Sequence, residues 1–199
     1  MAKPQALTIQ MYVDVACSET QDTVLRMQRA EGLVRLGMHR KAGATRVRKL
    51  FQSGCAKLRL PTKLESQAPQ EAILINTAGG LTGGDRIETE ILAENGSDAI
   101  VNTQACERIY RSIGDDATVA TRLTVEENAR LAWLPQETIL FNEGRLARTL
   151  DVQLRGNAEL LAVEAVLFGR KAMNETVRSG TFHDRWRIRR DGKLIFADD

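Results

Sequence analysis

Thr77-Ala78-Gly79-Gly80-Leu81-Thr82-Gly83-Gly84-Asp85 is the stretch that organises this chain, with two glycine pairs closed by a carboxylate. It joins the continuous apolar run 72–76, which predicts a strand covered on both faces, to the alternating run 86–91, which predicts a second strand. Glycine has no Cβ, so it tolerates positive φ angles and lets another backbone come close. The sequence therefore predicts a strand-to-strand loop of defined shape, whose structural residues are Gly79, Gly80, Gly83 and Gly84.

A phosphate-binding role for this loop finds little support in the sequence. A P-loop needs lysine and a hydroxyl residue after its last glycine, and neither follows Gly84. A dinucleotide-binding loop opens a helix, whereas the run after Asp85 alternates like a strand. One alternative function is kept: a small-molecule enzyme that uses Gly79 to Asp85 as its ligand cradle. That reading lacks a second convincing catalytic group beside Asp85.

The rest of the chain is patterned as short strands separated by turns. Residues 117–125 and 146–154 both alternate as half-buried strands do, and Asp191-Gly192 predicts a type I′ hairpin turn. Turn signals at 94–97, 127–129 and 155–158 recur at intervals of about 30 residues, which suggests a weak internal repeat of stacked β-layers. The predicted fold is mainly β, with stacked or helically wound β-sheets and few short helices.

The segment 158–168 is the ambiguous one, because its apolar residues suit a buried helix and a two-sided strand almost equally. We favour a strand with a helical turn. Residues 1–28 lack a sustained pattern and are predicted to be a poorly ordered N-terminal extension. Residues 29–199 are predicted to form a single β domain.

The composition is that of an ordinary globular chain: 199 residues, 43% hydrophobic, with a formal net charge of +2. A dedicated nucleic-acid binder is expected to be far more basic. The stretch from Arg35 to Arg59 is locally basic, which leaves open a basic-faced RNA-binding β protein as a third function. That stretch has little aromatic interleaving for base stacking. We read it as a solvated strand face, for which an acidic protein is a better partner than RNA.

The three cysteines, Cys17, Cys55 and Cys106, have neither disulfide-framework nor zinc-site spacing, which is typical of reduced cytosolic cysteines. The sequence shows no apolar run of the roughly 20 residues that a membrane span needs and no secretory signal pattern. We therefore expect a cytoplasmic protein with no membrane partner.

Candidate chemistry rests on carboxylates. His39 and His183 lie in no recognisable catalytic or metal-binding setting. Carboxylate oxygens can hold divalent cations, and scattered single carboxylates hold them weakly and exchangeably. Six carboxylates lie beside glycines, a proline or tightly patterned residues instead of in charge runs: Asp85, Glu107, Glu137, Glu143, Glu164 and Glu175.

Two further segments have a specific pattern. Residues 104–112 place two arginines, a glutamate and a tyrosine together, and we expect a buried, salt-bridged corner there that includes Tyr110 and Arg111. In residues 133–141, Pro135 cannot donate a ladder hydrogen bond, so it predicts a sheet edge or a bulge, with Glu137 just beyond it.

Four ordered motifs together resemble the urease accessory protein UreD family, called UreH in some systems: TAGGLTGGD (77–85), TQACERIYRS (103–112), WLPQETILF (133–141) and GRKAMNETVRSG (169–180). The resemblance runs from about residue 29 to the end of the chain.

The resemblance implies a mainly β protein that is not an enzyme. It would act with UreF and UreG to load nickel into apo-urease, with UreG hydrolysing GTP, and would offer nickel a polar internal route without binding it tightly. Carried over by position, Asp85, Glu137 and Glu175 are the expected residues of this transient nickel route. A route for Ni²⁺ needs exchangeable oxygen ligands instead of a thiolate or imidazole cage.

Two features of this chain depart from the family pattern. Asn174 stands where the family is expected to have glycine, and asparagine tolerates positive φ better than most residues. Family members are also expected to continue well beyond the equivalent of Asp199, so the chain is expected to lack the family's C-terminal portion.

Overall fold

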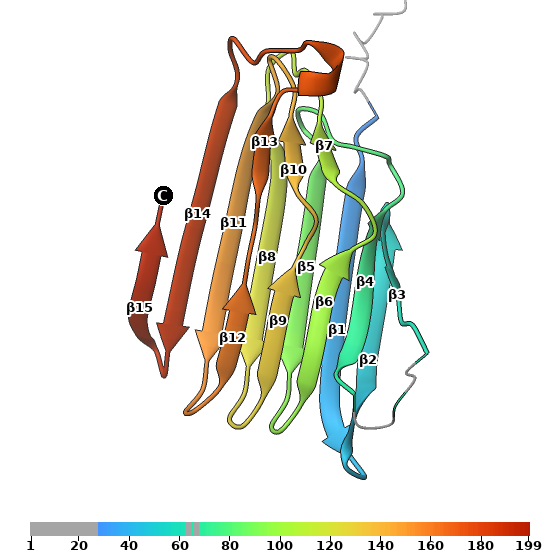
Figure 1. Cartoon of the computed structure of the whole chain (residues 1–199), viewed down its shortest axis with the longest axis vertical. Coiled ribbons are helices and arrows are strands. Elements are labelled where there is room, and N and C mark those ends of the chain that lie inside the picture. Colours follow the sequence, from blue (N-terminus) through green and yellow to red (C-terminus); the bar gives the residue numbers. More distant parts are fainter. Residues whose placement is uncertain (1–27, 63–64, 66–67) are drawn as a thin grey trace, which may run out of the picture.

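The computed structural model describes residues 28–62, 65 and 68–199, and it is built almost entirely from β-strands (Figure 1). Within these residues the one helical element is a short 3₁₀ turn, η1 (Lys171–Met173). The predicted mainly β fold with few short helices is confirmed. The predicted extension over residues 1–28 lies outside the described residues except for its last position.

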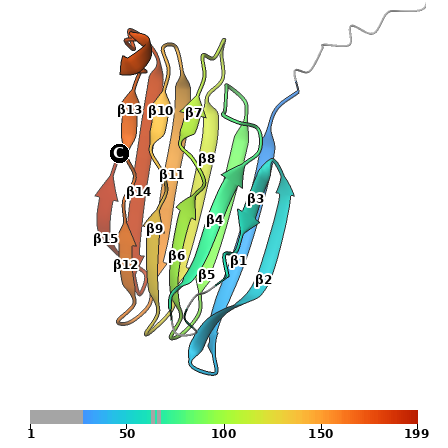
Figure 2. The ribbon, with the colours of Figure 1, turned by 45° about the vertical axis from the view of Figure 1, so that its right-hand side comes forward.

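Three sheets make up the fold. The largest is a seven-stranded sheet in the order β15 (Lys193–Asp198), β14 (Thr181–Arg190), β11 (Arg145–Leu154), β8 (Ala117–Val125), β5 (Arg86–Ala93), β1 (Glu31–Lys41), β2 (Ala44–Gly54). A five-stranded sheet lies across from it in the order β12 (Glu159–Ala162), β9 (Arg130–Leu134), β6 (Asp98–Thr103), β4 (Gln70–Asn76), β3 (Ala56–Arg59). A three-stranded sheet continues that second layer in the order β13 (Val166–Phe168), β10 (Thr138–Leu140), β7 (Glu107–Ile109). Figure 2 shows the two layers side by side.

The chain winds through the layers as a solenoid. It runs through β5, β6 and β7, then repeats that path one level over as β8, β9 and β10, and again as β11, β12 and β13. Strands of successive coils pair in parallel: Arg86 lies opposite Thr118, and Ala147 lies opposite both Thr118 and His183. The suggested internal repeat is therefore confirmed, as coils of a stacked β-structure.

The three predicted turns stack on one another at one end of the coils. Asn157 Nδ2 donates to Asn128 Oδ1 at 2.9 Å, and Asn128 N donates to Asn157 Oδ1 at 2.8 Å. Gly96 N donates to the carbonyl of Glu127 in the next turn. Polar turn residues thus align successive coils through direct hydrogen bonds.

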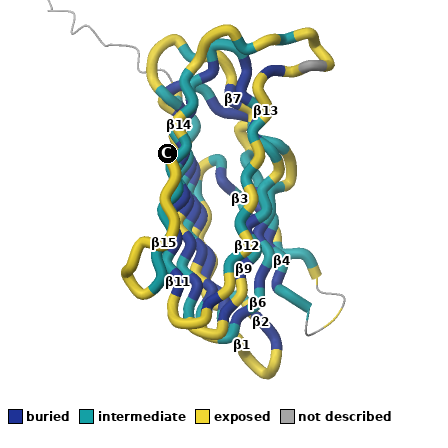
Figure 3. Tube along the Cα trace, turned by 60° about the vertical axis from the view of Figure 1, so that its left-hand side comes forward, coloured by how far each residue is buried: buried dark blue, intermediate teal, exposed yellow. Residues whose placement is uncertain are grey.

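One apolar core fills the space between the layers. Inward-facing residues of the large sheet, such as Leu36, Ile91, Leu123 and Leu150, are at most 2% exposed, and the core cluster joins them to residues of the opposite sheet such as Val101 and Leu131. In Figure 3 buried positions lie within the strands of both layers, whereas many of the turns at the ends of the coils are exposed. Each fully buried aliphatic side chain contributes about 1.5–3 kcal/mol.

Three further predictions concern single strands and turns. Within residues 158–168, Glu159–Ala162 form β12 and Val166–Phe168 form β13, so the strand interpretation is confirmed, whereas the helical turn expected in this described segment is not found. Asp191 (φ 48°) and Gly192 (φ 80°) turn the chain between the antiparallel strands β14 and β15, as predicted. The strand at 72–76 is confirmed, but the expectation of two covered faces is wrong. Ala72 and Leu74 are buried while Ile73 and Ile75 are only half-buried, because β4 has the core on one side.

None of the helical structure in the described part of the chain has the length and apolar character that crossing a membrane requires.

Candidate functional site

The glycine loop 77–85 packs tightly against the chain's own residues. Gly79, Gly80 and Gly84 have φ angles of 77°, 150° and 85°. A Cβ on Gly80 would lie 2.4 Å from Tyr110 Cε2, and a Cβ on Gly83 would lie 2.1 Å from Ser112 Oγ. The space that the glycines leave is thus filled by the segment that follows β7. Positive φ angles and close approach of other residues to the glycines are the two features that the sequence predicts for this loop.

Asp85 closes this loop from the inside. Its side chain is part of a residue only 5% exposed; Oδ1 accepts a hydrogen bond from Ala30 N and Oδ2 accepts one from Thr82 N, both at 2.8 Å. Both carboxylate oxygens therefore hold backbone N–H groups that would otherwise be left unpaired in a buried loop.

The segment 104–112 is not the buried, salt-bridged corner that we expected. Arg108 and Tyr110 are exposed, and the ion pair between Arg111 and Glu143 (2.5 Å) lies on the surface, with side chains 72% and 41% exposed. The segment is short and strands alternate, so only Ile109 of this run reaches the core. Arg108, Tyr110 and Arg111 consequently face solvent, whereas Glu107, on the same side of the strand as Ile109, is half-buried.

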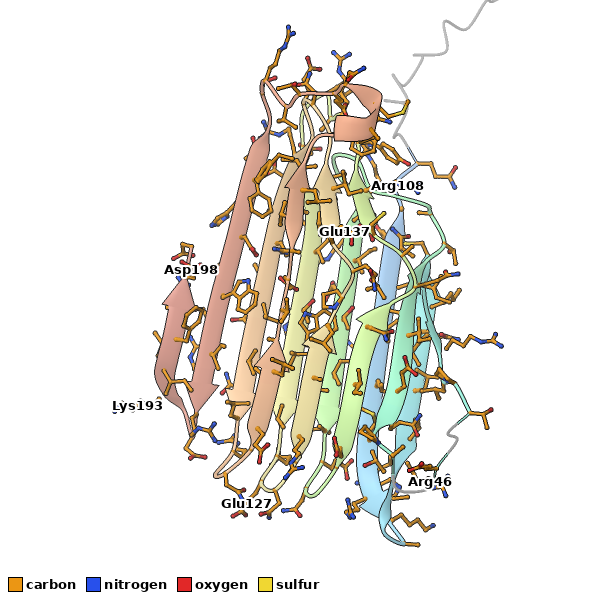
Figure 4. The ribbon with its side chains drawn as sticks, viewed as in Figure 1. Arg46, Arg108, Glu127, Glu137, Lys193 and Asp198 are labelled. Atoms are coloured by element: carbon orange, nitrogen blue, oxygen red, sulfur yellow. The ribbon has the colours of Figure 1, made fainter. Side chains whose placement is uncertain are left out.

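Pro135 lies in the break between the end of β9 at Leu134 and the start of β10 at Thr138, which belong to different sheets, so it interrupts the ladder as expected but marks neither a bulge nor an edge within a strand. The neighbouring Gln136 N donates to Thr103 Oγ1 at 2.9 Å. Glu137 is half-buried within this break, at the junction of the five-stranded and three-stranded sheets (Figure 4).

Glu175 lies in the turn after η1 and is held by Arg170. Its Oε2 is 2.7 Å from Arg170 Nε, and this hydrogen bond is the main reason why the pKa of Glu175 is lowered. The preceding residue, Asn174, has a φ of 54°, so asparagine does occupy a positive-φ position there.

Asp85, Glu137 and Glu175 belong to three different loops, and each has a different local role. Among the described residues, no group of three or more histidine, cysteine or acidic side chains is arranged to hold a metal ion.

A cavity of about 200 Å³ lies between the layers and is the candidate site. Its walls come from strands of all three sheets, and they mix apolar residues with polar ones, which include Asn76, Thr89, Glu107, Thr121, Thr138, Arg148 and Glu164. Buried polar groups in a largely apolar cavity are the usual composition of a binding site or a passage.

Glu107 brings one carboxylate to this cavity from β7. Both of its oxygens accept from Asn76 Nδ2, at 3.0 and 3.1 Å. Burial nevertheless raises the pKa of Glu107 above its ordinary value, because desolvation of the charged form outweighs these hydrogen bonds.

Glu164 brings the second carboxylate, from the loop between β12 and β13. Its side chain is only 4% exposed, and burial raises the pKa of Glu164 although Arg148 lies 3.2 Å away. Trp133 Nε1 donates to Oε1 at 2.9 Å. Oε2 accepts no hydrogen bond within the described part of the chain, because the nearby Nε–H of Arg148 points to Asp184 Oδ1 at 3.0 Å.

Arg148 and Asp184 are the charged residues that our sequence interpretation did not single out. Arg148 lies in β11 on the same side as Leu146 and Leu150, and it is buried with them. The sequence did contain a signal for Arg148, because it is a charged residue at an inward position of an alternating strand. Burial of an unpaired charge is strongly unfavourable, so such a residue requires a partner of opposite charge. Asp184 carries no such signal. It becomes Arg148's partner only because β14 pairs with β11 in register.

Comparison with known proteins gives a consistent result. A family model described as "UreD urease accessory protein" matches residues 30–199. "Urease accessory protein UreD" from Mesorhizobium japonicum is 55% identical over 172 residues, which is 86% of this chain and 61% of that protein. The protein of the same name from Rhizobium etli is 54% identical over 177 residues, covering 89% of this chain and 64% of that protein.

"Urease accessory protein UreD 1" from Brucella ovis is 51% identical over 175 residues, covering 88% of this chain and 62% of that protein. The chain thus spans somewhat less than two thirds of the length of each of these relatives. A family match over nearly all described residues, together with identities above one half, is decisive: the chain belongs to the UreD urease accessory protein family.

Proposed function

We propose that this protein is a scaffold for urease maturation that assists, with UreF and UreG, the GTP-dependent insertion of nickel into apo-urease. In this proposal it works in the cytoplasm and is not itself an enzyme. Nickel is a transient cargo and not a resident cofactor. The protein's contribution is a carboxylate-lined route along which the ion is passed on.

The observation that carries this proposal is the polar wall of the cavity between the sheets. Glu107 and Glu164 both line it, and the Oε2 atom of Glu164 has no hydrogen-bond donor within the described residues. Carboxylate, hydroxyl and amide oxygens bind divalent cations exchangeably, which suits passage. Within the described residues, the cavity wall includes Cys106 as its one thiol and has no histidine, so a soft-ligand cage is not available there.

Asp85, Glu137 and Glu175, the route residues implied by the family resemblance, remain part of the proposal, but their positions support it to different degrees. Glu137 lies between Gln136 and Thr138, which both line the cavity. Asp85 and Glu175 hold N–H donors, as Glu107 does, but neither they nor their neighbours in sequence line the cavity. We therefore rank Glu107, Glu164 and Glu137 above Asp85 and Glu175 as route residues.

The test is urease activation in cells that express urease with its accessory proteins. Replacement of Glu107 or Glu164 by glutamine, and of Glu137, Asp85 or Glu175 by alanine, is followed by measurement of urease activity and of nickel per urease. We expect the largest losses for Glu107→Gln and Glu164→Gln. Glu127→Gln, at an exposed turn remote from the cavity (Figure 4), is the matched control and should activate urease normally.

Normal activation in all five variants would remove the proposed route. Full urease maturation after deletion of the whole reading frame, with no second copy present, would remove the proposed function.

The two alternative functions gain no specific support. The glycine loop that a small-molecule enzyme would use as its cradle is filled by Tyr110 and Ser112. In the basic stretch, Arg35 pairs with Glu90 at 2.7 Å and Arg48 pairs with Glu94 at 2.8 Å, so part of the charge that RNA would require is neutralised.

A further inference from the structure

A groove of about 860 Å³ lies on the outer face of the three-stranded sheet, beside η1. We call it the outer groove; its walls include Cys106, Arg108, Tyr110, Ile139, Leu167 and Met173. The outer groove borders the inner cavity, and Cys106 and Arg108 line both. Ile109 and Leu140 point into the core, whereas their neighbours Arg108 and Ile139 point outward.

The floor of the outer groove is apolar and open to solvent. Ile139 lies between Arg108 and Leu167 in register across the sheet. Leu167 is 50% exposed, Tyr110 38% and Met173 68%. A contiguous apolar surface of this kind, unlike scattered single residues, marks a site of interaction.

The groove also carries a cation without an acidic partner. Arg108 projects from β7 in the row of Ile139 and Leu167 (Figure 4), and it forms no ion pair with any described carboxylate, although other exposed arginines such as Arg35 and Arg111 do. The second cation, Arg170, is already paired with Glu175 and lies 4.1 Å from the centre of the Phe141 ring. The groove therefore lacks one negative charge that would complement it.

We propose that the outer groove docks an acidic amphipathic segment of a partner protein, whose apolar side chains cover Ile139 and Leu167 and whose carboxylate pairs with Arg108. The proposal rests on the function proposed above, since it assigns one of that machinery's proteins to this surface. Tyrosine and arginine are among the residues that most often dominate binding energy at protein interfaces. A carboxylate partner would form charge-assisted hydrogen bonds with the planar guanidinium.

Two other occupants fit the groove less well. A second copy of this chain, related by a two-fold axis through the groove, would bring a second unpaired arginine into the interface and no carboxylate, because the same patch meets itself and the described walls of the groove contain no acidic residue. A nucleic acid would require several cations to neutralise phosphates, and the groove offers one unpaired cation on an apolar floor.

The first experiment measures binding of the purified chain to purified UreF, UreG and apo-urease, each as a separate probe, by isothermal titration calorimetry. Arg108→Glu reverses the unpaired charge, and Leu167→Asp places a charge on the floor at a half-exposed position that should not disturb folding. We expect each to weaken binding to one of the three probes at least tenfold. Arg46→Glu, on the exposed side of β2 and distant from the groove in Figure 4, makes the same charge change and should bind normally.

The second experiment uses Cys106, which lines the groove and is half-buried, as a reporter. In a Cys17→Ser/Cys55→Ser background, the rate at which N-ethylmaleimide modifies Cys106 is followed by mass spectrometry with and without the partner. Docking in the groove should slow this modification at least fivefold. This test leaves Arg108 and Leu167 unchanged, so it does not depend on altering the charge of the groove.

The outcomes separate this proposal from the proposed function. If a probe binds the parent chain but binds both groove variants equally well and leaves Cys106 unprotected, the outer groove is not its docking site while the maturation role stands. If none of the three probes binds the parent chain, both proposals fail.

Discussion

Glu107 illustrates how a single residue's surroundings can oppose its ionisation. Its carboxylate faces an inner cavity, and burial raises its pKa above the ordinary value of 4.5 even though Asn76 donates to both oxygens. The folded protein therefore holds a proton at pH values where the unfolded chain has released it.

Replacement of Glu107 by glutamine should remove a pH dependence. Because the folded-state pKa of this acid is raised, the free energy of unfolding falls as pH rises from about 4.5 through the raised pKa. Glutamine stays neutral, and its carbonyl can still accept from Asn76. We expect Glu107→Gln to be more stable than the parent above this window and equal to it below, by urea denaturation from pH 4 to 8. A constant difference across that range would contradict the assignment, and Glu127→Gln in an exposed turn serves as control.

Arg148 shows the opposite situation, a buried charge that its neighbours require. Its guanidinium lies between Glu164 and Asp184, so it connects the two layers of the solenoid. Arg148→Met would leave the buried Glu164 and the partly buried Asp184 without a cation, and we expect a loss of about 3–5 kcal/mol in the free energy of unfolding. Addition of Glu164→Gln should recover part of that loss.

The control for this change is Arg122→Met on the outer face of the large sheet. Arg122 is 53% exposed and bridges Glu88 and Glu90 at 3.5 and 3.1 Å. An exposed pair of this kind contributes at most about 1 kcal/mol. Equal losses for the two substitutions would show that the Arg148 network has no special role.

Among the elements, the glycine loop is the one whose shape depends on close packing. Gly79 and Gly80 are adjacent and both have positive φ, but their surroundings differ: a Cβ on Gly79 would have no heavy atom within 4 Å, whereas one on Gly80 would meet Tyr110 and the carbonyl of Arg108. This difference allows strain and crowding to be measured separately.

Gly79→Ala should cost about 1–2 kcal/mol through backbone strain alone. Gly80→Ala should cost about 1–3 kcal/mol more, because Tyr110 or the strand behind it must move. Thermal and urea denaturation of the two variants would measure the difference. Equal destabilisation would mean that Tyr110 adapts freely and that the loop is not a packing contact.

The strands themselves were the most predictable elements. Alternation in residues 117–125 and 146–154 gave the correct strands, and Asp191-Gly192 marked the correct hairpin, because period-two patterns and positive-φ turns are local properties. The buried corner expected at 104–112 was wrong, because a three-residue strand gives too little pattern to show which side chains face the core.

In the whole molecule, the two layers share one core and should unfold together. The protein has two tryptophans, and they report on different sheets: Trp133 lies in β9 and Trp186 in β14. Trp133→Phe and Trp186→Phe each leave one reporter, whose fluorescence follows unfolding of its own layer.

For each single-tryptophan variant, we compare the unfolding transition seen by fluorescence with the transition seen by circular dichroism of the same variant, which reports loss of secondary structure. We expect the two transitions to coincide in both variants. Coincident transitions are the mark of a cooperative, two-state unit. A fluorescence midpoint that is separated from the circular dichroism midpoint in either variant would show that the layers are independent.

The sequence by itself determined the β class of this protein, the position of its turns and, through four ordered motifs, its family, because strand periodicity, glycine conformations and motifs are read from neighbouring residues. Only the tertiary structure decided which carboxylates share a cavity. Glu107 and Glu164 reach it from distant parts of the chain, and Asp184 meets Arg148 only through the parallel register of β11 and β14. The physical reason is that burial and charge pairing are set by winding of the coils, which no local pattern specifies.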